Sequence, residues 1–175
     1  MNIKREKDVS TMIFEALCVL IIDKKRETSK LSVKDIVEEA GVCRNSFYRN
    51  YSDIDEILLK KMDSVWTTTA IDGGIERYEG VERALYYYFS VVRSNERFFR
   101  AFYLSNPGRY FDMFSKMIIQ SNSKNEAGEV SRNDYYRFAC RAWVGVGIMT
   151  EWMLRDFDLS IDEMIRLVMN AYKDW

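Results

Sequence analysis

The sequence predicts an all-α protein. Only one proline and eight glycines occur among 175 residues, so few residues interrupt a regular backbone. Apolar residues recur mostly at three- and four-residue spacing, which is the period of an amphipathic helix. With 47% apolar and 14% aromatic residues, the chain can bury a large core. We expect two domains, with three short helices in residues 1–53 and a larger helical bundle in residues 54–175.

The first predicted helix runs from about residue 9 to residue 23. Its apolar residues share one helical face: Val9, Met12, Ile13, Ala16, Leu17 and Leu20. A polar loop over residues 24–30 follows and predicts the end of this helix.

A second helix is predicted to begin after Ser32 and to end at Gly41. The Ser32 hydroxyl can cap the helix while Asp35, three residues on, bonds back in a capping box. Gly41 can take the left-handed conformation that closes a helix. The third helix then covers about residues 44–50.

A fourth helix is predicted over about residues 54–69. Ser52 and Asp55 repeat the capping-box pattern at its start, and Asp72-Gly73-Gly74 breaks it. The helices predicted after this break cover residues 81–94, 96–104, 107–121 and 132–155, followed by a last helix capped by Ser160 and Glu163.

Residues 31–51 have the layout of a helix-turn-helix. Gly41 supplies a turn residue without Cβ strain. Apolar residues stand where the two helices would cross: Ile36, Ala40, Val42, Phe47 and Tyr51. In such a motif the second helix lies in the major groove of DNA. The alternative is a capped helical hairpin with a charged solvent face.

The polar residues of the second helix of this motif suit DNA contacts. Arg44 and Asn45 suit base edges, because Arg pairs with guanine and Asn with adenine. Ser46, Tyr48 and Arg49 suit phosphate oxygens, which set register more than sequence.

The start of the preceding helix adds two candidate phosphate contacts, Ser32 and Lys34. Residues 1–51 carry 10 Lys+Arg against 8 Asp+Glu, and the remaining residues carry 16 against 19. This asymmetry is small but has the sign that DNA binding by the first part requires.

At these residues the sequence resembles the TetR/AcrR (tetracycline-repressor) family of bacterial transcription regulators. The family pattern is an apolar residue with Ser/Thr, a helix ending in Ala-Gly, then Val-Ser, and a short helix ending Phe-Tyr-x-x-Phe. The matching residues occur in order: Leu31-Ser32, Ala40-Gly41-Val42, Phe47-Tyr48 and Tyr51. This resemblance covers about residues 9–62. A weaker one, to the C-terminal domain of Firmicutes members, rests on Trp143, Gly145, Gly147, Trp152 and the turn over residues 154–160.

The resemblance implies a homodimer that binds two half-sites about one helical turn apart. It also implies, for many members, an effector pocket in the C-terminal domain. We expect a repressor that a small apolar or aromatic effector releases from its operator, with duplex DNA and a second copy of the chain as partners. The alternative is a constitutive regulator or a protein-interaction adaptor of the same fold.

Three positions depart from the family pattern. Cys43 replaces the usual Ser cap of the recognition helix, which weakens that cap. Asn50 stands where His or another polar residue is frequent. Ile54 occupies the place of a phosphate-binding Lys, beside Asp53 and Asp55, and is left out of the site. The predicted DNA-binding residues are Ser32, Lys34, Cys43, Arg44, Asn45, Ser46, Tyr48 and Arg49.

Aromatic residues are frequent in the middle helices. Small-molecule pockets are mostly apolar with a few polar groups, so these residues predict an effector site. For each of them the alternative is ordinary packing in a helical core. The predicted ligand-binding residues are Trp66, Tyr86, Phe89, Phe99, Phe102, Tyr103, Phe111 and Phe114.

Gly145 and Gly147 lie inside an otherwise strong helix pattern, where each costs about 1 kcal/mol relative to Ala. Such positions suggest the close approach of another backbone, and we expect a helix of the partner subunit there. A dinucleotide-binding loop is rejected, because the third glycine and the preceding strand are absent. The predicted dimer contacts are Gly145, Met149, Trp152, Met153, Met164 and Val168.

Composition argues against several other classes of protein. The chain has no histidine, which removes the commonest general base and metal ligand, so we expect no enzyme, metal or cofactor. Cys18, Cys43 and Cys140 are widely spaced and odd in number, which fits a reduced cytoplasm. The longest apolar run, residues 16–22, is too short to span a bilayer, so no membrane partner is expected.

Overall fold

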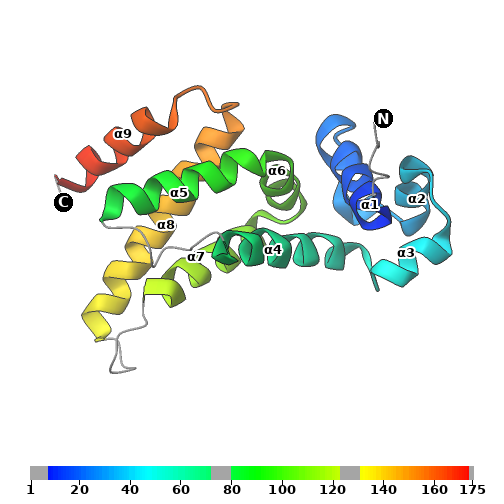
Figure 1. The fold of residues 1–175 in the computed structure, drawn as a ribbon, viewed down its shortest axis with the longest axis horizontal. Coiled ribbons are helices and arrows are strands. Elements are labelled where there is room, and N and C mark those ends of the chain that lie inside the picture. Colours follow the sequence, from blue (N-terminus) through cyan, green and yellow to red (C-terminus); the bar gives the residue numbers. More distant parts are fainter. Residues whose placement is uncertain (1–7, 72–79, 123–130, 174–175) are drawn as a thin grey trace, which may run out of the picture. The chain divides into compact units, whose positions relative to one another are not determined.

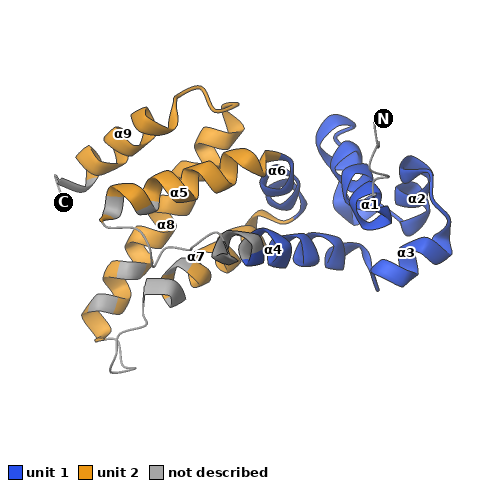
Figure 2. Ribbon diagram, viewed as in Figure 1, with its two compact units in different colours: residues 1–74, 97–105 blue, residues 75–96, 106–175 orange. Residues whose placement is uncertain are grey.

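A computed structural model of the chain describes residues 8–71, 80–122 and 131–173. Every regular element in these ranges is helical, which confirms the predicted all-α fold (Figure 1). The chain divides into two compact units, shown in Figure 2. The first contains residues 1–74 and 97–105, and the second contains residues 75–96 and 106–175.

The first unit is built around its N-terminal helix. Its helices are α1 (Val9–Cys18), α2 (Val33–Ala40), α3 (Arg44–Asn50), α4 (Ile54–Ile71) and α6 (Glu96–Ser105), with a π-helical turn (Val19–Asp23) after α1 and a 3-10 turn (Thr28–Lys30) before α2. α1 contacts α2, α3 and α4. The predicted first helix therefore has the expected length, but its last turn is widened into a π-helix.

Five side chains from four helices form the centre of this unit and are fully buried: Ile13, Leu17, Ile36, Phe47 and Ile57. Burial of such a side chain contributes about 1.5–3 kcal/mol each. Val9 and Met12, at the edge of the predicted apolar face of α1, are only half-buried. The core thus packs α3 against α1 and α2.

α6 belongs to this first unit although it follows a helix of the second. Arg97 pairs with Asp23 (Nη2 to Oδ2, 3.0 Å) and with Glu15 (Nε to Oε2, 3.6 Å). At the other end of α6, the Thr28 hydroxyl donates to the Ser105 hydroxyl at 3.1 Å. The compact units therefore differ from the domains expected at residue 53, and that functional boundary stays a prediction.

The capping boxes explain where the helices begin. Ser32 and Asp35 cap α2 reciprocally, as predicted. The expected pair at the start of α4, Ser52 with Asp55, is wrong by one residue. The carboxylate of Asp53 accepts from the N–H of Glu56 at 2.9 Å, and the carboxylate of Glu56 accepts from the N–H of Ser52 at 2.5 Å. Asp is as good a first cap as Ser, and Glu reaches back better than Asp.

The second unit contains α5 (Val81–Ser94), α7 (Pro107–Asn122), α8 (Arg132–Leu154) and α9 (Ile161–Lys173). α5 packs against α8 and α9, and α7 packs along α8. A core cluster joins three of these helices through Phe89, Trp152, Met164, Ile165 and Val168. The predicted box at the start of α9 is confirmed, since the N–H of Ser160 donates to the Glu163 carboxylate at 2.8 Å and the Ser160 hydroxyl accepts from the N–H of Glu163 at 3.3 Å.

No helix in the described ranges combines the length and the apolar composition that crossing a membrane requires.

Candidate nucleic-acid interface

The turn between α2 and α3 has the geometry that the sequence predicts. Gly41 adopts a left-handed conformation (φ 66°, ψ 31°). Its N–H bonds to the carbonyl of Glu38 at 3.3 Å, and the N–H of Val42 bonds to the carbonyl of Val37 at 3.0 Å. An L side chain at residue 41 would be strained by this φ. The glycine thus closes α2 and redirects the chain into α3.

The inner face of α3 fixes the orientation of the helix. Phe47 is fully buried and Tyr51 is 6% exposed, with ring centroids 5.9 Å apart. The Tyr51 hydroxyl donates to the carbonyl of Ser10 at 3.3 Å, which ties the end of α3 to α1. This leaves only one face of α3 available to a ligand.

The outer face of α3 carries unsatisfied donors. Arg44, Asn45, Tyr48 and Arg49 are exposed. In the part of the chain that the structure describes, none of them makes a side-chain hydrogen bond or an ion pair. The Tyr48 ring stands edge-on to Phe47, with centroids 5.4 Å apart, and remains 55% exposed. Two guanidinium groups, an amide and a phenol are therefore free to bind another molecule.

The start of α3 lacks a side-chain cap. Cys43 is the N-cap residue, and its thiol makes no hydrogen bond to the helix backbone. Its Sγ lies 3.2 Å from the Ser46 hydroxyl oxygen instead. This hydrogen bond and the nearby backbone N–H groups lower the pKa of the Cys43 thiol. The position is exposed, so a thiol with a lowered pKa lies beside the predicted base-reading residues.

Two predicted contacts on α2 are partly engaged within the chain. The Ser32 hydroxyl and backbone serve the capping box with Asp35. Lys34 forms an exposed i,i+4 pair with Glu38 at 3.7 Å. An exposed pair of this kind contributes little, so Lys34 can still move to a phosphate.

A polar cavity beside α3 was not predicted. It has a volume of about 420 Å³ and lies between the start of α1, the end of α3 and α4. Its basic lining residues are Arg49, Lys60 and Lys61. The sequence signal that could have found the two lysines is weak, because only the Glu56-Lys60 spacing marks this face of α4.

The acidic residues at the start of α4 have a local role. Asp53 caps the helix, as described above, where its negative charge is favoured by the helix dipole. Ile54, which is not among the predicted DNA-binding residues, is half-buried.

Part of the chain is similar in sequence to a known regulator. No protein-family profile matches the chain. An uncharacterized HTH-type transcriptional regulator of Haemophilus influenzae is 34% identical over 61 residues, which is 35% of this chain and 29% of that protein. Over that stretch the chain is similar to a helix-turn-helix regulator. The chain matches less than a third of the relative's length.

The fold as a whole also occurs in a solved protein. The crystal structure of Lin0861 from Listeria innocua superposes with a TM-score of 0.72, covering 99% of this chain and 94% of that one. The two sequences are 17% identical, so the likeness concerns the fold.

The eight predicted ligand-binding residues are distributed over both compact units. Phe99 and Phe102 are buried in the first unit, where Tyr103 is half-buried beside them in sequence. Phe89 belongs to the core of the second unit. The side chain of Trp66 lies outside those that the structure describes. Aromatic content alone could not reveal this division, because the members come from helices of both units.

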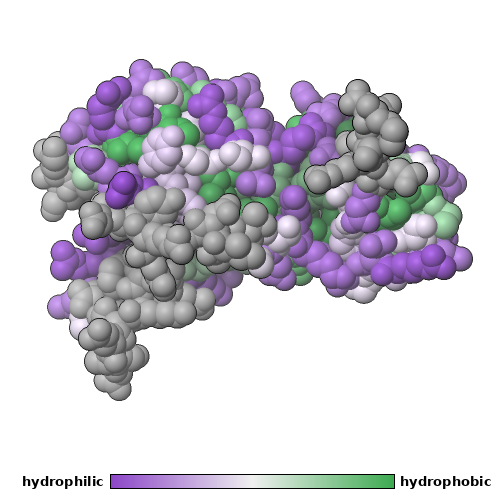
Figure 3. Space-filling model, viewed as in Figure 1, coloured by the Kyte–Doolittle hydropathy of each residue, from purple (hydrophilic) through white to green (hydrophobic). Residues whose placement is uncertain are grey.

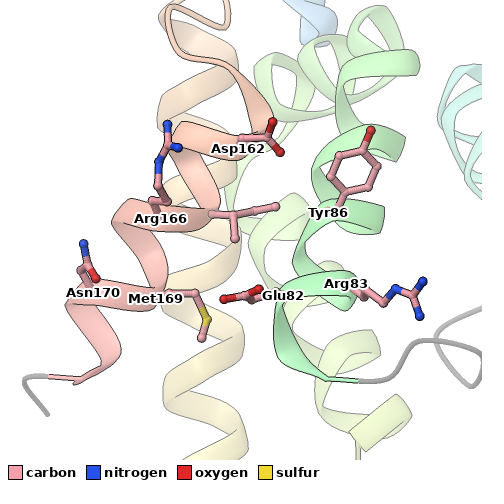
Figure 4. Close-up of a pocket in the computed structure, with 8 residues that line it drawn as sticks. Glu82, Arg83, Tyr86, Asp162, Arg166, Met169 and Asn170 are labelled. Carbon is pink, nitrogen blue, oxygen red and sulfur yellow. The ribbon is translucent and has the colours of Figure 1, made fainter.

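The remaining three lie in the second unit. Phe114 is buried, and the half-buried Phe111 stacks on Trp143 with ring centroids 6.0 Å apart and an interplanar angle of 6°. Tyr86 is 52% exposed and lines a groove between α5 and α9 (Figure 4). The groove has a volume of about 520 Å³ and is lined by Glu82, Arg83, Tyr86, Asp162, Ile165, Arg166, Met169 and Asn170. Charged side chains from both helices border it, which sequence reasoning missed.

Four of the predicted dimer contacts are buried within the subunit itself: Trp152, Met153, Met164 and Val168. Met149 packs against the same core cluster. A Cβ placed on Gly145 or Gly147 would meet no atom within 4 Å, so neither glycine is required by packing inside the subunit. Which residues form an interface stays a prediction.

Several of the apolar side chains that reach the surface lie on α8 and α9. Trp143 is 52% exposed and Leu167 is 56% exposed, and Val144 and Leu154 are partly exposed. On the face shown in Figure 3, hydrophobic patches are bordered by hydrophilic residues.

Thiol chemistry gives a first prediction about this region. With a thiol reagent near neutral pH, Cys43 should react fastest, because its lowered pKa raises the fraction of thiolate. Cys18 should react only on unfolding, since burial raises the pKa of its thiol to about 12. Cys140 is exposed and serves as the internal control. Labelling followed by peptide mass spectrometry measures the three rates.

Added duplex DNA should slow the labelling of Cys43 relative to Cys140. Equal slowing of both, or of neither, would argue against DNA lying on the start of α3.

Proposed function

We propose that the chain is a homodimeric transcriptional repressor that reads duplex DNA with α3. The observation that carries this proposal is the outer face of α3, where four donor side chains are exposed and unpaired. Its inner face is fixed by Phe47 and Tyr51, so the donors are held in a defined direction. The similarity of 61 residues to a helix-turn-helix regulator supports the same reading.

The predicted DNA-binding side chains fall into two groups, those that would contact bases and those that would contact phosphates. Arg44 and Asn45, in the first turn of α3, are proposed to contact base edges. Tyr48 and Arg49 are proposed to bind phosphate oxygens, with Lys34 and Ser32 as further phosphate contacts. Ser46 has a smaller role, because its hydroxyl already interacts with Cys43.

Selection from a pool of random duplexes tests this proposal. The purified chain should enrich one sequence as an inverted repeat, with half-site centres about one helical turn apart, because each subunit of a two-fold dimer reads one half-site. Failure to enrich any duplex would contradict DNA reading. Enrichment of a single half-site without a repeat would contradict the dimer.

We also propose that a small-molecule effector binds in the second unit. The groove between α5 and α9 falls in the size range of small-molecule sites, about 300–1,000 Å³. Arg83 and Arg166 are among the residues that line it, with Glu82 and Asp162. These charges favour a ligand with polar or charged groups as well as an apolar body, in place of the apolar or aromatic effector that aromatic content predicts.

A melting-temperature screen across a metabolite panel tests the groove. A ligand at about one hundred times its Kd should stabilise the protein by about 2.7 kcal/mol. Arg83→Met should reduce that shift by weakening affinity about tenfold, since a charge-assisted hydrogen bond is lost. Arg132→Met is the matched control, because it removes an exposed arginine outside the groove.

An equal reduction in both variants would argue against binding in the groove. A panel without any stabilising ligand would favour the constitutive alternative. A true effector must also bind with different affinity in the presence and absence of the enriched duplex, because coupling between two sites is reciprocal.

A further inference from the structure

Two side chains of α4 hold the end of α3. The ammonium of Lys60 donates to the carbonyl oxygen of Asn50, the last residue of α3, at 2.7 Å. The carboxylate of Glu56 accepts from the N–H of Ser52 at 2.5 Å. Lys60 and Glu56 are four residues apart on one face of α4 and form an ion pair of 3.1 Å. Side chains of α4 therefore form hydrogen bonds with backbone groups on both sides of Tyr51.

α3 lacks the usual means of ending a helix. The last carbonyls of a helix have no partner within it, and a left-handed glycine commonly satisfies them. Here the residue after α3 is Tyr51, which is extended (φ −142°, ψ 140°). The N–H of Tyr51 donates to the carbonyl of Phe47 at 2.9 Å, and the ammonium of Lys60 donates to the carbonyl of Asn50. A cation at this end is also favoured by the helix dipole.

The same ammonium contacts the anchor of α3. The Nζ of Lys60 lies 5.4 Å from the centroid of the Tyr51 ring. Tyr51 is buried and donates from its hydroxyl to Ser10 in α1. α3 has seven residues, and a helix of about two turns has little stability of its own. Its direction therefore depends on contacts such as these.

We propose that Lys60, supported by Glu56, is a positioning residue that orients α3 for DNA without touching DNA. This inference rests on the proposed function. Without the lysine, α3 retains its charged outer face and its buried anchors, but its C-terminal end is held less firmly. Affinity for the enriched duplex then falls, while the general attraction to DNA remains.

Lys60 also lines the polar cavity with Arg49 and Lys61, so a direct phosphate contact is the competing explanation. The two roles give different salt dependence. Loss of a phosphate contact weakens binding to all duplexes alike and lowers the slope of log K against log salt by about one. Loss of positioning weakens binding to the enriched duplex and leaves that slope unchanged.

The test compares Lys60→Met with Lys61→Met in the full chain. Both remove one positive charge from adjacent residues of α4, but the Nζ of Lys61 lies over the Phe14 ring, 5.2 Å from its centroid. Fluorescence anisotropy is measured with the enriched duplex and a scrambled duplex of equal length, from about 50 to about 200 mM salt. Lys60→Met should bind the enriched duplex about tenfold more weakly. Its affinity for the scrambled duplex and its salt slope should match those of the wild type.

Two further variants separate positioning from loss of structure. Lys60→Arg keeps a cationic donor and should restore most of the affinity. Glu56→Gln keeps Lys60 and should shift affinity in the same direction as Lys60→Met, by a smaller factor. Amide hydrogen exchange of α3 in the free protein should be faster in Lys60→Met than in Lys61→Met, because the end of the helix opens more often.

The possible outcomes are distinct. Unchanged affinity and unchanged exchange in Lys60→Met would overturn the inference. If Lys60→Met lost affinity equally for both duplexes and its slope of log K against log salt fell by about one, a direct phosphate contact would replace the positioning role. A wild-type chain that enriches no duplex overturns the proposed function and this inference together, whereas wild-type binding that Lys60→Met leaves intact overturns this inference alone.

Discussion

Replacing Arg44 and Arg49 together by alanine is expected to weaken binding to the enriched duplex about a hundredfold, or about 2.7 kcal/mol. Both side chains are exposed on the outer face of α3. Arg44 should contribute base discrimination, so its loss relaxes the preference at one position of each half-site. Arg49 should contribute a phosphate contact, so its loss lowers the salt slope by about one per subunit. Anisotropy titrations at several salt concentrations measure both effects.

The control for this variant is Lys116→Ala with Arg155→Ala, which removes the same net charge from the second unit. Each of these residues forms an exposed i,i+4 pair, with Asp112 and Glu151. The control should bind DNA within about twofold of the wild type, because exposed pairs contribute little. A control as weak as the α3 variant would show that net charge, and not the face of α3, governs binding.

Phe47→Ala is expected to lower the free energy of unfolding of the first unit by about 3–5 kcal/mol. The Phe47 ring is fully buried and contacts the rings of Tyr48 and Tyr51. Its removal leaves a cavity under α3 in a protein whose total stability is of order 5–15 kcal/mol. Urea denaturation followed by far-ultraviolet circular dichroism should show an early transition for part of the helical signal.

Tyr48→Ala is the matched control for Phe47→Ala. It removes the adjacent aromatic ring of α3, but that ring is 55% exposed. The change in unfolding free energy should stay within about 0.5 kcal/mol, while DNA affinity falls. If Tyr48→Ala destabilised the unit as much as Phe47→Ala, the assignment of inner and outer faces of α3 would be wrong.

Most helix boundaries could be predicted because short-range hydrogen bonds set them. Ser32 with Asp35 and Ser160 with Glu163 are three residues apart. The sequence pattern therefore names the two residues that form each hydrogen-bonded cap. The start of α4 shows the limit of this reasoning. Ser52 and Asp53 each begin a valid box pattern, and the choice depends on Glu56, which also pairs with Lys60.

The outer face of α3 could also be anticipated, because it follows from which residues of one short helix are apolar. The contact between Lys60 and Asn50 could not, since it requires the turn that brings α4 against the end of α3. The packing partners of the aromatic residues were harder still to predict. Phe89 and Phe99 are ten positions apart in similar sequence surroundings, yet they are buried in different units. Periodicity identifies a buried face but not its partner.

The placement of α6 has a consequence for how this protein can be divided. The first unit is completed only when residues 97–105 return to it after a helix of the second unit. A fragment ending at residue 74 would lack the buried Phe98 and Phe102 and the pairing of Arg97 with Asp23. The first unit is therefore not a module that recombination could exchange at a single crossover, and a transplanted first unit must carry α6 with it.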